Sequence, residues 1–209
     1  MTKRPTLLAS LLTLFTAVGT ARADDAPTSP SPDEKTGVQL DFHYGVLQPI
    51  LLRGFNAAVD VRGRRWMLSY SHGQGLEFSR APGALTKQEE AAGVRIVAPI
   101  STGGGVGYRL WRELYVMADV KVHRFEVAAS REVSRYTTVT VGAEVGYRIF
   151  LYKGLHITPV VRFWPNVWDN APSGGVEVAT ADGSLRHEPL KQGSNGVFAN
   201  VLVGWAFDL

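Results

Sequence analysis

The chain has 209 residues, of which 45% are hydrophobic and 20% charged, and it contains no cysteine. This length suits one sizeable domain, and the lack of cysteine excludes disulfides and thiolate metal sites. After residue 23 no apolar run approaches the roughly 18 residues that a membrane-spanning helix needs, so the sequence excludes a helical membrane protein.

Residues 1–23 have the three parts of a secretory signal peptide. A basic start, with Lys3 and Arg4, precedes an apolar stretch at 7–18 and the small-residue pattern Ala-Arg-Ala at 21–23. We predict export and cleavage after this pattern. Cleavage takes away three of the 22 basic side chains and no acidic one, which leaves 19 of each sign. The basic isoelectric point therefore gives no argument for a nucleic-acid partner.

Residues 24–37 are rich in proline, serine and acid and have no apolar period. This composition predicts a flexible periplasmic tether. From residue 38 onward, apolar and polar residues alternate with a period of two, which predicts an all-β domain over 38–209. Eight strands are expected, at 38–47, 55–62, 64–72, 102–109, 114–123, 139–149, 155–163 and 197–209.

The connections between these strands alternate in length. Every second connection is a tight turn. Loops are expected at 48–52 and 128–135, and the longest ones run from 73 into the nineties and over 169–194. This pattern predicts an antiparallel up-and-down arrangement with short turns at one end and long loops at the other.

The polar phase of the strands carries charges of both signs, and most of the cations are arginines. Such side chains can pair inside a narrow lumen. We predict an inward charge network of Asp41, Asp60, Arg62, Arg109, Asp119, Lys121, Glu144, Arg148 and Arg162. This network either holds the packed barrel interior together or acts as a gate in the lumen. Eight strands enclose a space that side chains fill, so we do not expect an open channel.

Alternation alone does not decide whether the apolar face meets lipid or points inward, as in a soluble lipocalin-like carrier. Aromatic residues gather near the short turns, where an interfacial girdle would lie: Trp66, Tyr108, Trp111, Tyr147, Phe150, Tyr152, Trp205 and Phe207. Together with the export signal, this favours an eight-stranded transmembrane β-barrel in the bacterial outer membrane, with short periplasmic turns and longer extracellular loops. A soluble periplasmic barrel or sandwich is the alternative.

From residue 38 to the C-terminus, the pattern resembles the eight-stranded outer-membrane barrels of the OmpA and OmpX type. The final strand carries the most specific part of this resemblance, because its alternate residues are similar to the C-terminal signal read by the barrel-insertion machinery: Val203, Trp205, Phe207 and Leu209. Such families usually end in Phe or Trp, and this chain ends in Leu209. The segments 121–127 and 136–142 are also similar to hypothetical outer-membrane proteins, a resemblance that implies no activity.

Proline and glycine modify the predicted strands. Pro159 falls within one strand and Pro99 near another, and a closed barrel has no free edge. Bulges are therefore expected at both, unless Pro99 belongs to the preceding loop. Gly103, Gly105 and Gly107 share an inward face, where they are expected to leave room for bulky side chains such as Tyr115 and Met117.

The sequence also raises two chemical hypotheses, a metal site and a lipid-modifying enzyme. The five histidines form no closely spaced set of three or four ligands in the sequence, so no metal site is predicted. The barrel enzymes that remove acyl chains from lipid A carry a serine, a histidine and an acid, for which Ser71, His72 and Glu77 are the candidates here. Adjacent residues of a strand face opposite sides, which disfavours this enzyme.

An Asp-Gly turn at 182–183 predicts that two strands continue beyond the membrane as a hairpin, either as a binding platform or as a stiff end. Our interpretation is a non-catalytic outer-membrane protein that acts in envelope structure or through its loops. Its expected partners are outer-membrane lipid and lipopolysaccharide, and the insertion machinery during assembly. No cofactor is expected, and the sequence does not identify an extracellular partner.

Overall fold

The computed structural model describes residues 37–81, 84–129, 132–173, 175–179, 185–188 and 196–209. The predicted signal peptide lies outside these residues, as does the predicted tether except for Gly37. No helix among the described residues is long and apolar enough to span a membrane.

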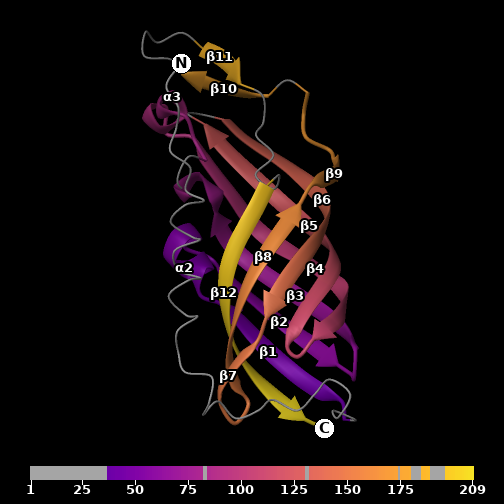
Figure 1. Cartoon of the computed structure of the whole chain (residues 1–209). Coiled ribbons are helices and arrows are strands. Elements are labelled where there is room, and N and C mark those ends of the chain that lie inside the picture. The colour runs from indigo at the N-terminus through magenta and orange to yellow at the C-terminus, as the bar shows by residue number, and fades with distance from the viewer. Residues whose placement is uncertain (1–36, 82–83, 130–131, 174, 180–184, 189–195) are drawn as a thin grey trace, which may run out of the picture. The chain divides into compact units, whose positions relative to one another are not determined.

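Strands dominate the described chain (Figure 1). They are β1 (Gln39–Gly45), β2 (Phe55–Arg62), β3 (Trp66–Glu77), β4 (Arg95–Trp111), β5 (Leu114–Ala129), β6 (Glu132–Tyr147), β7 (Ile149–Tyr152), β8 (Leu155–Trp164), β9 (Asn166–Asp169), β10 (Val176–Ala179), β11 (Leu185–Glu188) and β12 (Gly196–Asp208). The helical elements are α2 (Leu47–Leu52), the 3-10 turn η2 (Phe78–Arg80) and α3 (Lys87–Ala91).

Eight of these strands close into a barrel. Each strand from β1 to β6 pairs with the next, β6 pairs with β8, β8 with β12 and β12 with β1, and all of these pairs are antiparallel. The short strands β7 and β9 follow β6 and β8 in the chain and pair with β8 and β6, respectively. The predicted eight-stranded up-and-down antiparallel barrel is therefore confirmed.

The outer surface of the barrel is apolar over its central part. We call this surface the apolar belt; it consists of exposed side chains on all eight strands, namely Phe42, Tyr44, Val61, Trp66, Leu68, Tyr70, Val106, Leu110, Val120, Val122, Val141, Val145, Val161, Phe163, Val203, Trp205 and Phe207. The positions between them point inward, and there the buried side chains are mostly polar or charged. Polar residues inside and apolar residues outside are the reverse of the pattern in a water-soluble barrel.

The two faces exchange character toward the end that carries α3. On β5, the inward residues beyond His123 are Phe125, Val127 and Ala129, all buried, whereas Arg124 is exposed on the outer face. Outside, Arg135 of β6 pairs with Glu126 at 2.7 Å. This part of the barrel therefore has a water-soluble pattern, apolar inside and polar outside.

An apolar core fills this end of the barrel. We call it the apolar cap; its buried members are Leu52, Leu76, Val94, Ile96, Ala98, Phe125, Val127, Ala129 and Tyr136. Residues of η2 and of the segments around α3 pack against it, among them Phe78, Leu85 and Ala92. The cap closes the lumen at the end where the connections are long.

Several predicted boundaries are corrected. The predicted loop at 48–52 contains α2, and strands β3 to β6 extend beyond the predicted 72, 102, 123 and 139. The expected connection at 128–135 is largely strand, because β5 reaches Ala129 and β6 begins at Glu132. The predicted continuation into a hairpin is seen as the pair β10 and β11, whereas its Asp-Gly turn lies outside the described residues.

The two prolines behave differently. The register of β4 against β5 shifts by one residue between Val97 and Ile100, which is the bulge expected at Pro99. The bulge expected at Pro159 is wrong, because Pro159 pairs with Val201 in an unbroken register. On the other side of β8, Pro159 has no N–H to offer to a neighbouring strand, and at this level β6 has ended and β7 has not yet begun. The N–H of Arg148, which lies between these two strands, donates to the Glu113 carbonyl oxygen at 3.3 Å.

Candidate functional site: a charged centre in the lumen

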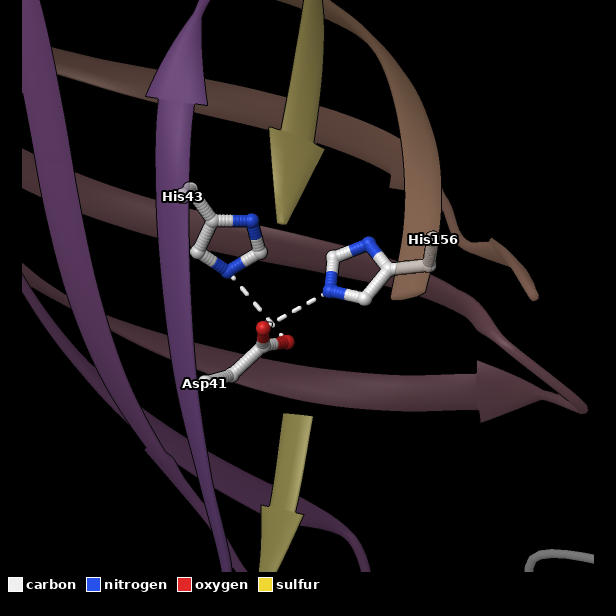
Figure 2. Close-up of side chains that lie close together, drawn as sticks. All are labelled: Asp41, His43 and His156. Carbon is white, nitrogen blue, oxygen red and sulfur yellow. Dashed lines mark hydrogen bonds and ion pairs between the residues drawn. The ribbon is translucent and has the colours of Figure 1, made fainter. Parts of the chain in front are cut away.

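The most densely connected buried group in the lumen is the Asp41 carboxylate, which is fully buried on β1. Its Oδ1 lies 2.7 Å from His156 Nε2, and its Oδ2 lies 3.3 Å from His43 Nε2. Figure 2 shows both imidazole rings directed at this carboxylate from different strands. Two side chains that lie far apart in the sequence thus converge on one acid.

Two arginines hold the same carboxylate. Arg148 Nη1 donates to Asp41 Oδ2 at 2.9 Å, and Arg62 Nε forms an ion pair with that oxygen at 3.2 Å. Arg148 also donates to Glu113 at 2.5 Å, and Arg62 donates to Asp60 at 2.6 Å. All five side chains are buried, so these charges attract one another with little screening by solvent.

Barrel register and one glycine bring the histidines together. His43 of β1 is paired with Gly204 of β12, and Gly204 is paired with His156 of β8. A Cβ atom on Gly204 would lie 2.4 Å from His156 Cε1 and 2.6 Å from the Phe42 carbonyl oxygen. Only glycine at this position lets the His156 ring lie across β12 and reach Asp41.

A second charged group lies on β5, β6 and β8. Glu144 forms an ion pair with Arg162 and accepts a hydrogen bond from the Tyr115 hydroxyl at 2.7 Å. Asp119 accepts a hydrogen bond from the Trp164 indole at 2.8 Å, and the Lys121 ammonium lies 4.5 Å from the centre of that indole ring.

Nine residues were predicted to form the inward network, and the structure places all nine inside the barrel, each at most 7% exposed. Arg109 lies at the short-turn end, where it donates to the Gly63 carbonyl oxygen at 3.5 Å. The inward glycines lie opposite large side chains: a Cβ on Gly105 would be 3.1 Å from Met117 Cγ, and one on Gly107 would be 2.5 Å from Met67 Cγ. Tyr115 packs over Gly146 instead.

Sequence reasoning missed the third member of a possible metal-binding set. Asp41 and His43 share a strand face, but His156 is far away in the chain, so the three residues form no closely spaced set in the sequence although the fold brings them together. Asp41, His43 and His156 each offer one ligand atom, and these atoms lie within 4.8 Å of one another. The sequence could have indicated this third member, because His156 stands at an inward-facing position and a glycine lies opposite it on the neighbouring strand.

A further buried chain of polar groups joins three neighbouring strands. Ser101 Oγ of β4 lies 2.8 Å from His123 Nδ1 of β5, and His123 Nε2 lies 3.1 Å from Thr140 Oγ1 of β6. Both ring nitrogens thus face hydroxyl groups and not a carboxylate, so this arrangement lacks the orienting acid of a hydrolytic triad.

The residues suggested for acyl-chain hydrolysis are not brought together. Ser71 is buried on the lumen side of β3, whereas His72 faces outward with its ring 6.3 Å from the Phe55 ring. The register of β3 against β2 is regular here, with no bulge to turn either side chain. Glu77 lies beyond them and forms an ion pair with Arg95 at 3.3 Å.

The proposed assembly signal lies on the outer face of β12 and at Leu209, the residue after this strand. Val203, Trp205, Phe207 and Leu209 are all exposed, while the alternating positions 202, 204 and 206 are buried. The Phe207 ring packs edge-to-face against the Phe42 ring of β1, with ring centres 6.0 Å apart. This contact lies at the seam where the first and last strands close the barrel.

Comparisons with known proteins give structural similarity only. No family model matches the chain, and no curated protein matches it. The N-terminal β-barrel domain of OprF from Pseudomonas aeruginosa is similar with a TM-score of 0.49 and 10% identity, over 83% of this chain and 98% of that one. A major outer membrane protein from Thermus thermophilus is similar with a TM-score of 0.43 and 11% identity, over 82% of this chain and 98% of that one.

Proposed function

We propose that this protein is an integral barrel of a bacterial outer membrane, without catalytic activity, that acts in envelope structure or surface interaction through its long connections. The observation that carries the proposal is the apolar belt around a charged interior. Lipid is the solvent that makes such a belt favourable, since apolar area exposed to water costs about 25 cal/mol per Å². A soluble lipocalin-like carrier would have the opposite arrangement.

The height of the belt supports a membrane crossing. On β5 the outward apolar positions run from Leu114 to Val122, and Arg124 follows them on the same face. This length agrees with the roughly 9–11 residues that a tilted strand needs to cross a bilayer. Exposed Trp66, Trp111 and Tyr152 flank the short turns, where interfacial aromatic residues are favoured.

The interior supports a structural role. Paired charges fill the lumen, and the apolar cap closes it toward the long connections. Strands β4, β5 and β6 continue beyond the belt toward α3 and the β10–β11 hairpin (Figure 1). This extension has its own packed core, so it would present the connecting segments on a rigid support rather than on long free loops.

Cell fractionation combined with gel mobility tests the proposal. The full chain should be recovered in the outer-membrane fraction, and it should migrate faster on a denaturing gel before boiling than after, because a closed ladder of strands resists detergent. A known soluble periplasmic protein and a known outer-membrane barrel from the same cells provide the two controls. Recovery of the chain wholly in the soluble fraction would refute the membrane assignment.

The lipid-modifying alternative has its own test. Because Ser71 and His72 face opposite sides of β3, we expect Ser71→Ala and His72→Ala to leave the lipid A acyl pattern of the host unchanged by mass spectrometry. Cells without the protein are the control. Loss of an acyl chain on expression of the natural protein, abolished by either substitution, would replace the non-catalytic proposal with an enzyme.

A further inference from the structure

We propose that Asp41, His43 and His156 bind a divalent transition-metal ion in the lumen of the barrel. Their three donor atoms lie within 4.8 Å of one another, with His156 Nε2 2.7 Å from Asp41 Oδ1 and His43 Nε2 3.3 Å from Asp41 Oδ2. In a tetrahedral zinc site, bonds of about 2.0–2.1 Å place neighbouring donors about 3.3 Å apart. A metal ion therefore fits between these atoms after side-chain shifts that are smaller than a change of rotamer.

The surroundings orient His156 in the way that metal sites require. His156 Nδ1 lies 3.0 Å from Thr158 Oγ1, so with an ion bound, a proton on Nδ1 can be donated to this hydroxyl while the Nε2 lone pair faces the ion. On the other side, Asp60 Oδ2 lies 2.9 Å from His43 Nε2. Asp60 also pairs with Arg62, and it is not among the three residues whose donor atoms lie within 4.8 Å of one another.

The two arginines leave Oδ1 of Asp41 to His156, whereas His43 shares Oδ2 with them. Arg148 and Arg62 both approach Oδ2, at 2.9 and 3.2 Å, and His156 approaches Oδ1. The guanidinium groups therefore fix the plane of the carboxylate and do not cover Oδ1. Second-shell partners of a ligating carboxylate act in this way.

Each guanidinium group that holds Asp41 also holds a second acid, because Arg62 also pairs with Asp60 and Arg148 also pairs with Glu113. The Asp41 carboxylate is thus fixed within a wider buried network of charge pairs, as a ligating carboxylate needs to be.

The donor set indicates which ions bind. Two imidazoles and one carboxylate suit zinc, copper, nickel or cobalt, whereas calcium and magnesium prefer a shell of oxygens. The site lies between the belt strands and is enclosed by protein. The ion would therefore enter while the barrel folds and would exchange slowly afterwards.

Cobalt(II) provides the first test, with the full chain carrying no histidine tag. The protein is refolded from urea into detergent micelles with cobalt, passed through a chelating resin, and analysed for bound metal and for visible absorption. We expect about one cobalt per chain with the intense ligand-field bands of a four-coordinate site. His156→Gln and His43→Gln should each reduce binding at least by the roughly 10–100-fold that loss of a second-shell partner causes.

His123→Gln is the matched control, because His123 is equally buried in the lumen but contacts Ser101 and Thr140 instead of the Asp41 centre. This variant should retain cobalt. Failure of the wild type to retain cobalt would overturn the proposal. Retention by His156→Gln at the wild-type level, or equal loss in His123→Gln, would overturn it as well.

A second measurement needs only the wild-type chain, so it does not depend on whether the variants fold. Copper(II) bound during refolding should show hyperfine couplings from two imidazole nitrogens in electron paramagnetic resonance. Couplings from one nitrogen or none would place the ion elsewhere and would refute the assignment to His43 and His156.

Discussion

At the scale of single residues, the barrel interior is held by specific pairs rather than by a diffuse field of charge. Glu144 has two defined partners, because Arg162 forms an ion pair with one carboxylate oxygen and the Tyr115 hydroxyl donates to the other. All three side chains are at most 3% exposed. Breaking such a pair leaves a buried charge without compensation, whereas replacing both partners with apolar groups removes the cost together with the attraction.

This argument gives a prediction for Glu144→Leu. The substitution should lower the free energy of unfolding by about 3 kcal/mol, since Arg162 would lose its ion pair in a buried site. Urea unfolding in detergent, followed by tryptophan fluorescence, measures the change. The double variant Glu144→Leu, Arg162→Met should recover most of the loss. Equal destabilisation by the single and the double variants would show that the pair itself is not the source.

Inward and outward positions could be predicted from the sequence at this scale, because strand periodicity is strict. Asp41, His43 and His156 all stand in the polar phase, and all three are buried in the lumen. Their convergence could not be predicted, since it depends on the register between strands that lie far apart in the chain and on the missing side chain of Gly204. Periodicity specifies the face on which a side chain lies but not its neighbours across the lumen.

At the scale of strands, the main differences between the predicted and the observed strand boundaries have one physical cause. The apolar phase of β5 is outward up to Val122 and inward from Phe125, so the alternation changes phase where the apolar belt ends. A change of phase looks like the end of a strand when one face is followed along the sequence. The predicted strand at 114–123 therefore stops early, although β5 continues to Ala129.

On β4 a backbone bulge changes which positions face inward. Ile96 and Ala98 point into the apolar cap, and after the bulge at Pro99 the odd-numbered positions, beginning with Ser101, point inward. Gly75 of β3, with a φ of +66°, lies beside this bulge between the pairs formed by Gln74 and Leu76. A left-handed glycine on one strand and a proline bulge on the next thus turn both strands together.

The last strand provides a prediction at this scale. Phe207 is exposed on β12 at the seam with β1, and it packs edge-on against Phe42. We expect Phe207→Ala to reduce the amount of folded barrel in the membrane severalfold, because the substitution weakens both the closing seam and the terminal pattern that we predict to be an assembly signal.

The fraction of chain that migrates in the fast, folded form on an unboiled gel measures this effect. Val133→Ala is the control, since Val133 is also an exposed apolar residue on a strand but lies beyond the belt. Equal loss of folded protein in both variants would deny the terminal strand a special role.

At the scale of the whole molecule, the two ends of the barrel differ, and in the proposed membrane barrel this difference predicts a direction of insertion. The connections at one end are tight, such as those after Trp111 and Tyr152, where Arg112 and Lys153 adopt positive φ values of 49° and 39°. The other end carries α3, the apolar cap and the extended strands. In bacterial barrels the short turns face the periplasm and the long connections face outward.

The chain contains no cysteine, so single introduced cysteines can test this direction without a background signal. Gln88 of α3 and Arg112 of the turn after β4 are both exposed. We expect Gln88→Cys to react with a membrane-impermeant maleimide on intact cells, and Arg112→Cys to react only after the outer membrane is opened. Each variant, labelled after lysis, is its own control for reactivity. Labelling of Arg112→Cys on intact cells with protection of Gln88→Cys would mean that the barrel is inserted in the opposite direction, and the long connections could then not act at the cell surface.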